Sequence, residues 1–126
     1  MAALYSEIIL DHFRHPRNYG SLPAPDISYE EFNPLCGDRI RIEVKLKNQS
    51  VVEDVRFRGD GCAISIAAAS LLTELIVGID IGALEAISDG RLISALESDI
   101  KPSRVQCALL PLEALRAGLR EFKSSN

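Results

Sequence analysis

Three cysteines and one aspartate are the residues of this chain with the most distinctive chemistry. Cys36 and Asp38 flank a single glycine, Cys62 follows the turn Gly59-Asp-Gly61, and Cys107 lies toward the C-terminal end. Three thiolates and one carboxylate would supply the four ligands of a tetrahedral zinc ion or of a [2Fe-2S] cluster. Because cysteine is also a small hydrophobic residue and the chain contains no Cys-x-x-Cys, three unrelated buried thiols are the alternative.

The surroundings of these residues add to the metal-site interpretation. Cys62 precedes a predicted helix whose free N–H groups stabilise a thiolate, so this cysteine is a candidate nucleophile or metal ligand. Zinc held by the three thiolates and Asp38 would carry a net negative charge, which favours a cation beside the ligands, and Arg104 is well placed to supply it. A hard carboxylate among soft thiolates indicates a site that exchanges its contents.

Alternation of apolar and polar residues predicts a small antiparallel sheet. Strands are predicted at residues 39–46 and 51–58, with an edge strand at residues 27–32. The short polar segment Lys47-Asn-Gln-Ser50 joins the two longer strands into a hairpin. In the simplest register of this hairpin Leu46 opposes Val51.

The open end of the hairpin brings candidate ligands together. Cys36 and Asp38 share the strand parity of the buried residues, so both point toward the face that helices cover. The simplest register puts Cys62 beside Cys36, and a register shifted by two residues puts Asp38 opposite Gly61; both registers group the first two cysteines with Asp38. Whether Cys107 joins them depends on how the helices fold back, which periodicity does not determine.

Helical periodicity accounts for the remaining segments. Helices are predicted at residues 3–14, 63–77 and 103–122, with two short amphipathic segments at 80–88 and 90–97. Ser103 and Gln106 fit a capping box at the start of the last helix. His12 and His15 are interpreted as surface or dipole-pairing groups without a chemical role, since no third ligand accompanies them.

Length and composition limit the classes of function. The 126 residues are the length of one domain, spanning 1–126, and 47% apolar residues are enough for a core that folds without metal. A net charge of -4 excludes a general nucleic-acid or anionic-membrane binder, so proteins or small ligands are the expected partners. We expect a cytoplasmic protein, because no apolar run is long enough to span a membrane and the N-terminus lacks a signal-peptide pattern.

Four motifs resemble the IscU/SufU/NifU-N-terminal family of iron–sulfur cluster assembly proteins over nearly the whole chain. Residues 5–18 are similar to the family's opening helix and turn, and Asn33-Pro-Leu-Cys-Gly-Asp38 is similar to its first ligand motif. Residues 59–65 resemble the second ligand motif and Ser103-Arg-Val-Gln-Cys107 the third. The resemblance implies an α+β fold of the SufE/NifU type, a two-layer sandwich with about three antiparallel strands and helices packed on one face.

The resemblance also implies a function and its site residues. A scaffold of this family accepts persulfide sulfur from a cysteine desulfurase, assembles a transient [2Fe-2S] cluster and passes it to acceptor or carrier proteins. By position, Cys36, Asp38, Cys62 and Cys107 would bind the cluster, iron or zinc, and Cys36 and Cys107 are the candidate persulfide acceptors. The first alternative is an enzyme, a SufU-like zinc-dependent sulfurtransferase that keeps zinc in the isolated form; the second is a structural zinc module.

Individual residues match different branches of the family. Gln106 replaces the histidine that precedes the third cysteine in the scaffold branch, and Arg104 and Gly61-Cys-Ala-Ile-Ser65 resemble the SufU-like branch. The short spacing between the second and third cysteines is IscU-like. Ile100-Lys-Pro-Ser-Arg104 stands in place of the scaffold branch's Leu-Pro-Pro-Val-Lys stretch, which argues against dependence on a dedicated Hsp70 chaperone.

Overall fold

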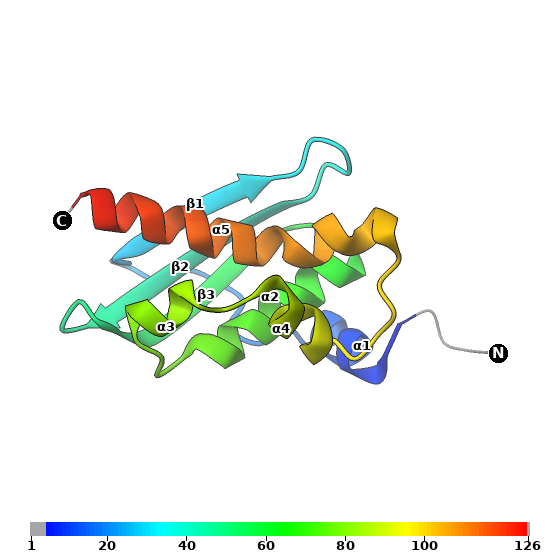
Figure 1. The fold of residues 1–126 in the computed structure, drawn as a ribbon, viewed down its shortest axis with the longest axis horizontal. Coiled ribbons are helices and arrows are strands. Elements are labelled where there is room, and N and C mark those ends of the chain that lie inside the picture. Colours follow the sequence, from blue (N-terminus) through cyan, green and yellow to red (C-terminus); the bar gives the residue numbers. More distant parts are fainter. Residues whose placement is uncertain (1–4, 126) are drawn as a thin grey trace.

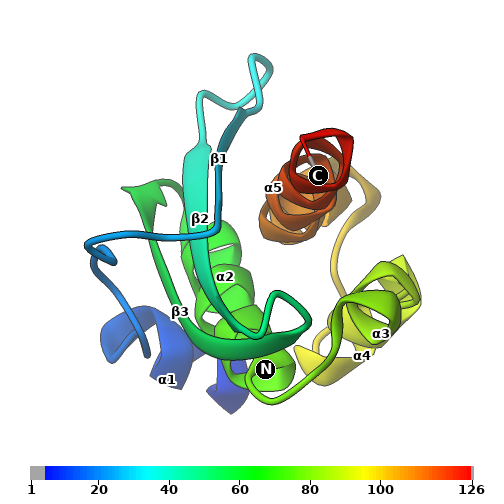
Figure 2. The same cartoon turned by 90° about the vertical axis from the view of Figure 1, so that its left-hand side faces the viewer.

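Three antiparallel strands in the order β1-β2-β3 form a sheet, and two long helices, α2 and α5, pack along one of its faces (Figure 1 and Figure 2). The computed structural model describes residues 5–125. Its elements are α1 (Glu7–Arg14), β1 (Ile27–Phe32), β2 (Arg39–Lys47), β3 (Val51–Asp60), α2 (Ala63–Ile76), α3 (Ile81–Glu85), α4 (Asp89–Ala95), a 3-10 turn (Pro102–Arg104) and α5 (Val105–Ser124). The predicted α+β class, with a small antiparallel sheet and helices on one face, is confirmed.

The core lies between the sheet and the two long helices. On β2, Ile40, Ile42 and Val44 are completely buried, as their alternation predicts. Helix α2 is buried on nearly every side, in agreement with its apolar sequence, and α5 lies close over β1. A Cβ atom at Gly118 would stand 2.7 Å from Ile27 Cγ2, so glycine at this position permits that close approach.

The hairpin register differs from the simplest expectation. Ile40 pairs with Gly59 and Ile42 with Phe57, so the register in which Leu46 opposes Val51 is wrong and the one shifted by two residues holds along most of the ladder. An irregularity at Leu46 and two consecutive turn residues with positive φ produce the shift. Continued to the end of the hairpin, this register directs Asp38 toward Gly61.

Helices α1 and α5 begin differently from their predicted starts. The described part of α1 begins at Glu7, with the Ser6 hydroxyl accepting the Ile9 N–H at 3.1 Å; positions 3 and 4 lie outside the described residues. The capping box at Ser103 is wrong, because Pro102 starts a 3-10 turn that includes Ser103 and no side chain caps α5. Within residues 5–125, no helix is both long and apolar enough to cross a membrane.

His12 is a buried group of the interface between α1 and α2, so its interpretation as a surface residue is wrong. Its side chain is 6% exposed, its Nδ1 lies 2.7 Å from Ser70 Oγ, and its Nε2 lies 3.5 Å from a Glu74 oxygen. Ser70 also accepts the Arg17 N–H at 2.8 Å. The geometry suits a neutral ring that accepts at Nδ1 and carries its proton on Nε2, toward Glu74.

The stability of the protein is expected to fall as the pH drops below about 6.5, the pKa of histidine in the unfolded chain. Burial and the Arg17 charge lower the pKa of His12 in the folded state, against the opposing charges of Glu74 and Asp11. The unfolded chain therefore gains this proton first, so the stability contribution is present above that pH and is lost below it. Urea unfolding of His12→Gln should show a shallower loss between about pH 6.5 and 5.

The exposed His15 provides the matched control for this prediction. His15→Gln should keep the pH dependence of the wild type. Equal pH slopes for His12→Gln and the wild type would contradict the prediction.

Candidate metal centre

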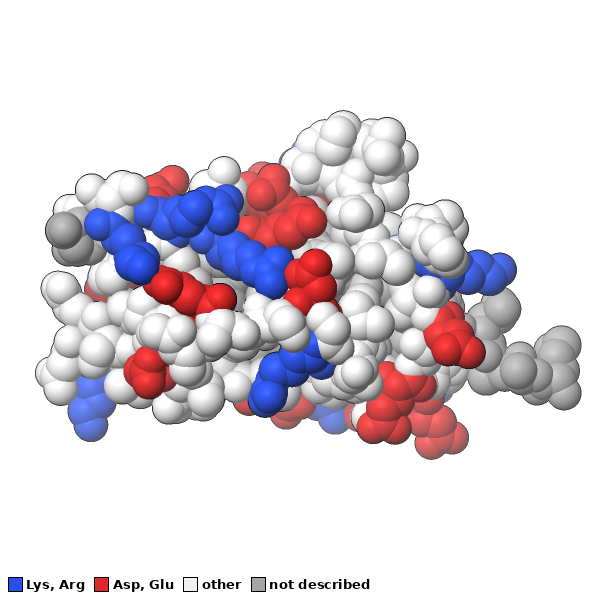
Figure 3. Space-filling view, viewed as in Figure 1, with Lys and Arg blue, Asp and Glu red and all other residues white. Residues whose placement is uncertain are grey.

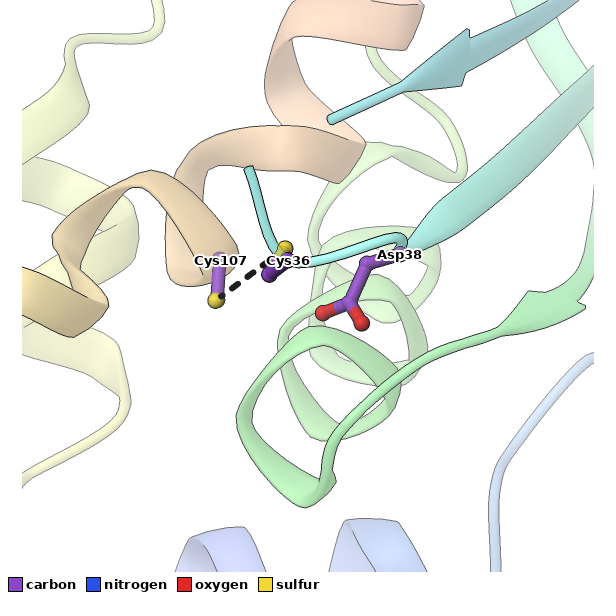
Figure 4. A group of neighbouring side chains, drawn as sticks. All are labelled: Cys36, Asp38 and Cys107. Atoms are coloured by element: carbon purple, nitrogen blue, oxygen red, sulfur yellow. Dashed lines mark hydrogen bonds between the residues drawn. The ribbon is translucent and has the colours of Figure 1, made fainter. Parts of the chain in front are cut away.

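Cys36, Asp38 and Cys107 form a compact group at one end of the sheet. One ligand atom from each residue lies within 4.8 Å of the other two, and the Cys36 and Cys107 sulfurs are 3.8 Å apart (Figure 4). Cys36 comes from the loop between β1 and β2, Asp38 directly precedes β2, and Cys107 lies in the first turn of α5. Residues separated by about 70 positions in the chain thus meet at one point.

The spacing of this group fits one metal ion. Sulfur ligands about 2.3 Å from a zinc ion at tetrahedral corners stand about 3.8 Å from one another. The distance between the Cys36 and Cys107 sulfurs, 3.8 Å, has this value, so both can bind the same ion without backbone movement. An iron of a [2Fe-2S] cluster also takes a pair of cysteine sulfurs, so the donor set suits either occupant.

Cys62 lies beside this group. Its backbone N–H points at Asp38 Oδ2 at 3.4 Å, and its sulfur lies 3.6 Å from Ser65 Oγ. It is half-buried and occupies the N-cap of α2, as its place before the predicted helix indicates. The structure therefore brings three of the four expected ligands within reach of one ion and puts the fourth next to the carboxylate.

The loop that carries Cys36 is closed by its own hydrogen bonds. The Asn33 N–H donates to the Asp38 carbonyl at 2.9 Å, the Gly37 N–H donates to the Asn33 carbonyl at 2.8 Å, and the Leu35 N–H donates to Asn33 Oδ1 at 2.9 Å. Gly37 has a φ of +79°, a conformation that glycine adopts without strain. The sharp turn leaves Cys36 exposed and directs Asp38 inward, where it is 7% exposed.

Ser65 is a site residue to which sequence analysis gave no role. It is completely buried, and its hydroxyl donates to Asp38 Oδ2 at 2.5 Å. The same hydroxyl lies 3.2 Å from the Cys107 carbonyl, which Pro111 leaves without its helical N–H partner. A hydroxyl residue three positions after Cys62, within the first turn of an apolar helix, is the signal that could have identified it.

Hydrogen bonds and burial set opposite proton affinities within the group. Burial would raise the pKa of Asp38, but hydrogen bonds from Ser65, the Cys62 N–H and the neighbouring thiols outweigh it and hold this pKa below its ordinary value. Burial and the neighbouring cysteine charges raise the pKa of Cys107 to about 12. At neutral pH the site therefore offers a carboxylate and a protonated Cys107 thiol, which loses its proton when a metal cation binds.

Arg104 lies on the open side of the site, as its position before Cys107 predicts. The side chain is exposed, and its hydrogen bond to Cys107 together with the charges of Cys62 and Cys107 raises the pKa of the guanidinium. It borders a pocket of about 200 Å³ that is also lined by Tyr5, Ile64, Asp99, Ile100 and Lys101. The neighbouring Gln106 is exposed.

Comparisons with known proteins agree on the kind of protein this chain resembles. Residues 4–126 match the family described as NifU-like N terminal domain. The zinc-dependent sulfurtransferase SufU of Bacillus subtilis is 38% identical, over 98% of this chain and 94% of its own length. The iron-sulfur cluster assembly scaffold protein IscU of Azotobacter vinelandii is 34% identical, over 94% of each chain. The crystal structure of a putative SUF-system scaffold from Fervidobacterium islandicum superposes with a TM-score of 0.77 at 26% identity, over 92% of this chain and 96% of that one.

The lengths of the two sequence alignments differ in an informative way. The alignment with SufU runs over 140 positions, more than the 126 residues of this chain, so that relative has residues with no counterpart here. The alignment with IscU runs over 122 positions, close to the part of the chain that it covers. The sequence identity is higher with SufU, whereas the near absence of insertions makes the spacing of elements closer to that of IscU.

Proposed function

The chain belongs to the NifU-like N-terminal domain family, and from this premise we propose that it is an iron–sulfur cluster assembly scaffold. The observation that carries the proposal is the convergence of two thiols and a carboxylate within 4.8 Å of one another, with Cys62 beside them. Cys36, Asp38, Cys62 and Cys107 hold the [2Fe-2S] cargo. Work of this kind takes place in the cytoplasm, where thiols stay reduced.

The chemistry begins with transfer of sulfur from a cysteine desulfurase. A thiolate of this chain, Cys36 or Cys107, attacks the terminal sulfur of the donor persulfide; a new S–S bond forms, the donor's S–S bond breaks, and the donor cysteine leaves as a thiolate. Ferrous iron then joins, and a thiol or protein reductant supplies the electrons that convert persulfide sulfur to sulfide. The finished cluster passes to acceptor or carrier proteins, which Asp38, a hard ligand among soft ones, facilitates.

A zinc-dependent sulfurtransferase is the second candidate, and two observations favour it. Gln106 offers no imidazole to a metal, and Arg104 stands close enough to Cys107 to share a hydrogen bond with it. The same residues would hold zinc, because the sulfur spacing fits a tetrahedral ion. Bound zinc would keep the thiols deprotonated, and the sulfur would pass from the accepting cysteine to a reducing thiol without cluster formation.

Metal analysis followed by anaerobic reconstitution distinguishes the two candidates. We expect that ferrous iron, cysteine and a cysteine desulfurase produce a visible absorption spectrum of sulfur-to-iron charge transfer on the wild-type chain. A Cys107→Ala variant should lose that spectrum, because it removes the ligand most enclosed by the fold. Tightly held zinc with accelerated desulfurase turnover and no chromophore would instead establish the sulfurtransferase.

If the wild-type chain shows no chromophore and does not accelerate desulfurase turnover, both candidates are overturned. A structural zinc module then remains, and it has its own signature: chelation would unfold the domain. We expect the apo-protein to keep its circular dichroism spectrum, since the core is built mainly from completely buried apolar side chains such as Ile42, Val55 and Phe57, which bind no metal.

A further inference from the structure

Ser65 holds the one carboxylate of the site through a short, fully enclosed contact. Its hydroxyl lies 2.5 Å from Asp38 Oδ2 and 3.2 Å from the Cys107 carbonyl oxygen, and its side chain is completely buried. A hydroxyl has a single proton to donate, which goes to the nearer and charged acceptor, Asp38. The Cys62 N–H, at 3.4 Å, supports the same oxygen from the start of α2.

The two carboxylate oxygens of Asp38 are therefore not equivalent. Ser65 and the Cys62 N–H both contact Oδ2, which leaves Oδ1 as the oxygen without these donors. In Figure 4 the carboxylate lies next to the two sulfurs, above the helix that begins after Cys62. A carboxylate fixed through one oxygen presents the other as a single, oriented ligand atom.

We propose that Ser65 is a positioning residue that fixes Asp38 as a one-oxygen metal ligand. The inference rests on the proposed function, because it concerns the same metal or cluster site. Ser65 itself binds no metal; it acts through Asp38. Partners of this kind, which hydrogen-bond a metal ligand, commonly affect metal affinity by about 10- to 100-fold.

Competitive titration of zinc against a chromophoric chelator tests the proposal. The affinity of Ser65→Ala for zinc should fall by about 10- to 100-fold. Cobalt(II) serves as a second probe, because the intensity and position of its visible bands report whether an oxygen ligand is retained. In Ser65→Ala we expect the cobalt spectrum to change, which a loss of stability alone would not produce.

A double-mutant cycle shows whether Ser65 acts through Asp38. In an Asp38→Ala background, the additional change Ser65→Ala should cost less than about twofold in zinc affinity, because the carboxylate that Ser65 positions is absent. Ser70→Ala is the matched control: Ser70 is a second completely buried serine of α2, but it contacts His12. This control should lower stability while leaving zinc affinity and the cobalt spectrum unchanged.

Three outcomes would overturn the positioning role. These are unchanged zinc affinity in Ser65→Ala, an equal loss in Ser70→Ala, or a full additional loss in the Asp38→Ala background. If the wild-type chain binds neither zinc, cobalt nor a cluster, the proposed function fails together with this inference. If the wild type binds and Ser65→Ala binds equally, only this inference fails.

A second observation concerns the loop that carries Cys36. Leu35 is 92% exposed, and the neighbouring Phe32 is 47% exposed with the Arg39 guanidinium 5.5 Å from its ring centre. No residue from 32 to 37 carries a charge, and the loop between β1 and β2 projects beyond the sheet as an uncharged tip (Figure 1 and Figure 3). An exposed leucine thus stands immediately before an exposed thiol.

We infer that Leu35 inserts into an apolar recess of the sulfur-donating protein, beside its persulfide cysteine. This inference also rests on the proposed function, and the partner is the cysteine desulfurase. Leu35 is exposed directly beside Cys36 in the chain, and the hydrogen bond of the Leu35 N–H to Asn33 Oδ1 at 2.9 Å holds the loop in shape before binding. Such preorganisation lowers the entropic cost of association.

Saturation kinetics with a purified desulfurase test this contact. In Leu35→Ser the half-saturating concentration should rise by about tenfold or more, while the maximal rate and zinc affinity stay at wild-type values. Val77→Ser is the control, because Val77 is also exposed, at 48%. It lies at the C-terminal end of α2, whereas Cys62 lies at the N-terminal end. An unchanged half-saturating concentration in Leu35→Ser, or an equal rise in Val77→Ser, would overturn the inference. If the wild-type chain shows no response to the desulfurase, the proposed function is overturned as well.

Discussion

Replacing Cys36 with serine is expected to lower the rate at which the chain accepts sulfur from a persulfide donor by several orders of magnitude. A sulfur acceptor must be reached by another protein and must react as a thiolate. Cys36 is exposed at the tip of its loop, whereas Cys107 is 2% exposed, and burial together with the neighbouring cysteines raises the pKa of its thiol to about 12. Of the two candidate acceptors, the structure therefore favours Cys36 as the first.

Mass spectrometry after brief incubation with desulfurase and cysteine measures this directly. The wild-type chain and Cys107→Ser should gain the mass of one sulfur atom on Cys36, and Cys36→Ser should gain none. The opposite pattern, with sulfur on Cys107 in Cys36→Ser and none in Cys107→Ser, would contradict the order. Cys107→Ser serves as the matched control, because it removes a thiol of the same site without touching the exposed loop.

Sequence patterns were sufficient to predict the end of the sheet at which the site lies. Strand parity predicts that Cys36 and Asp38 both point toward the helices. Asp38 is buried there, but Cys36 is exposed, because it lies in the turn before β2, where strand parity no longer applies. Position before a predicted helix put Cys62 at an N-cap, which it occupies. Periodicity could not predict that Cys107 joins the group, because that contact depends on the packing of α5 against the sheet and α2 over a long sequence separation.

Local features of the chain account for the differences between the predicted and the observed structure. Asn48 and Gln49 both adopt positive φ, so the hairpin turn is tighter than a four-residue connection and the register shifts. Pro102 begins a 3-10 turn, which takes Ser103 out of the capping position. His12 carried no periodic signal beyond its place on α1, since its hydrogen bond to Ser70 belongs to the packing of two helices.

Gly61→Ala is expected to reduce zinc affinity by about 10- to 100-fold while the protein stays folded. A Cβ atom at this position would stand 3.0 Å from Ser65 Cβ and 3.3 Å from Asp38 Cγ. Both distances are shorter than ordinary contacts, so the added methyl group would displace the Ser65 side chain or the Asp38 carboxylate. Because Asp38 is held by Ser65, a displacement of a few tenths of an ångström reaches a metal ligand directly.

Gly90→Ala separates this effect from a general consequence of adding a methyl group. A Cβ atom at Gly90 would meet only the Ser88 hydroxyl at 4.0 Å, and Gly90 lies in α4, away from the thiols. Its replacement by alanine should leave zinc affinity unchanged and raise stability slightly, because alanine is the better helix former. If Gly61→Ala binds zinc within about twofold of the wild type, the space beside Asp38 is not what positions the carboxylate, and the tight contact between Gly61 and Ser65 serves only the turn into α2.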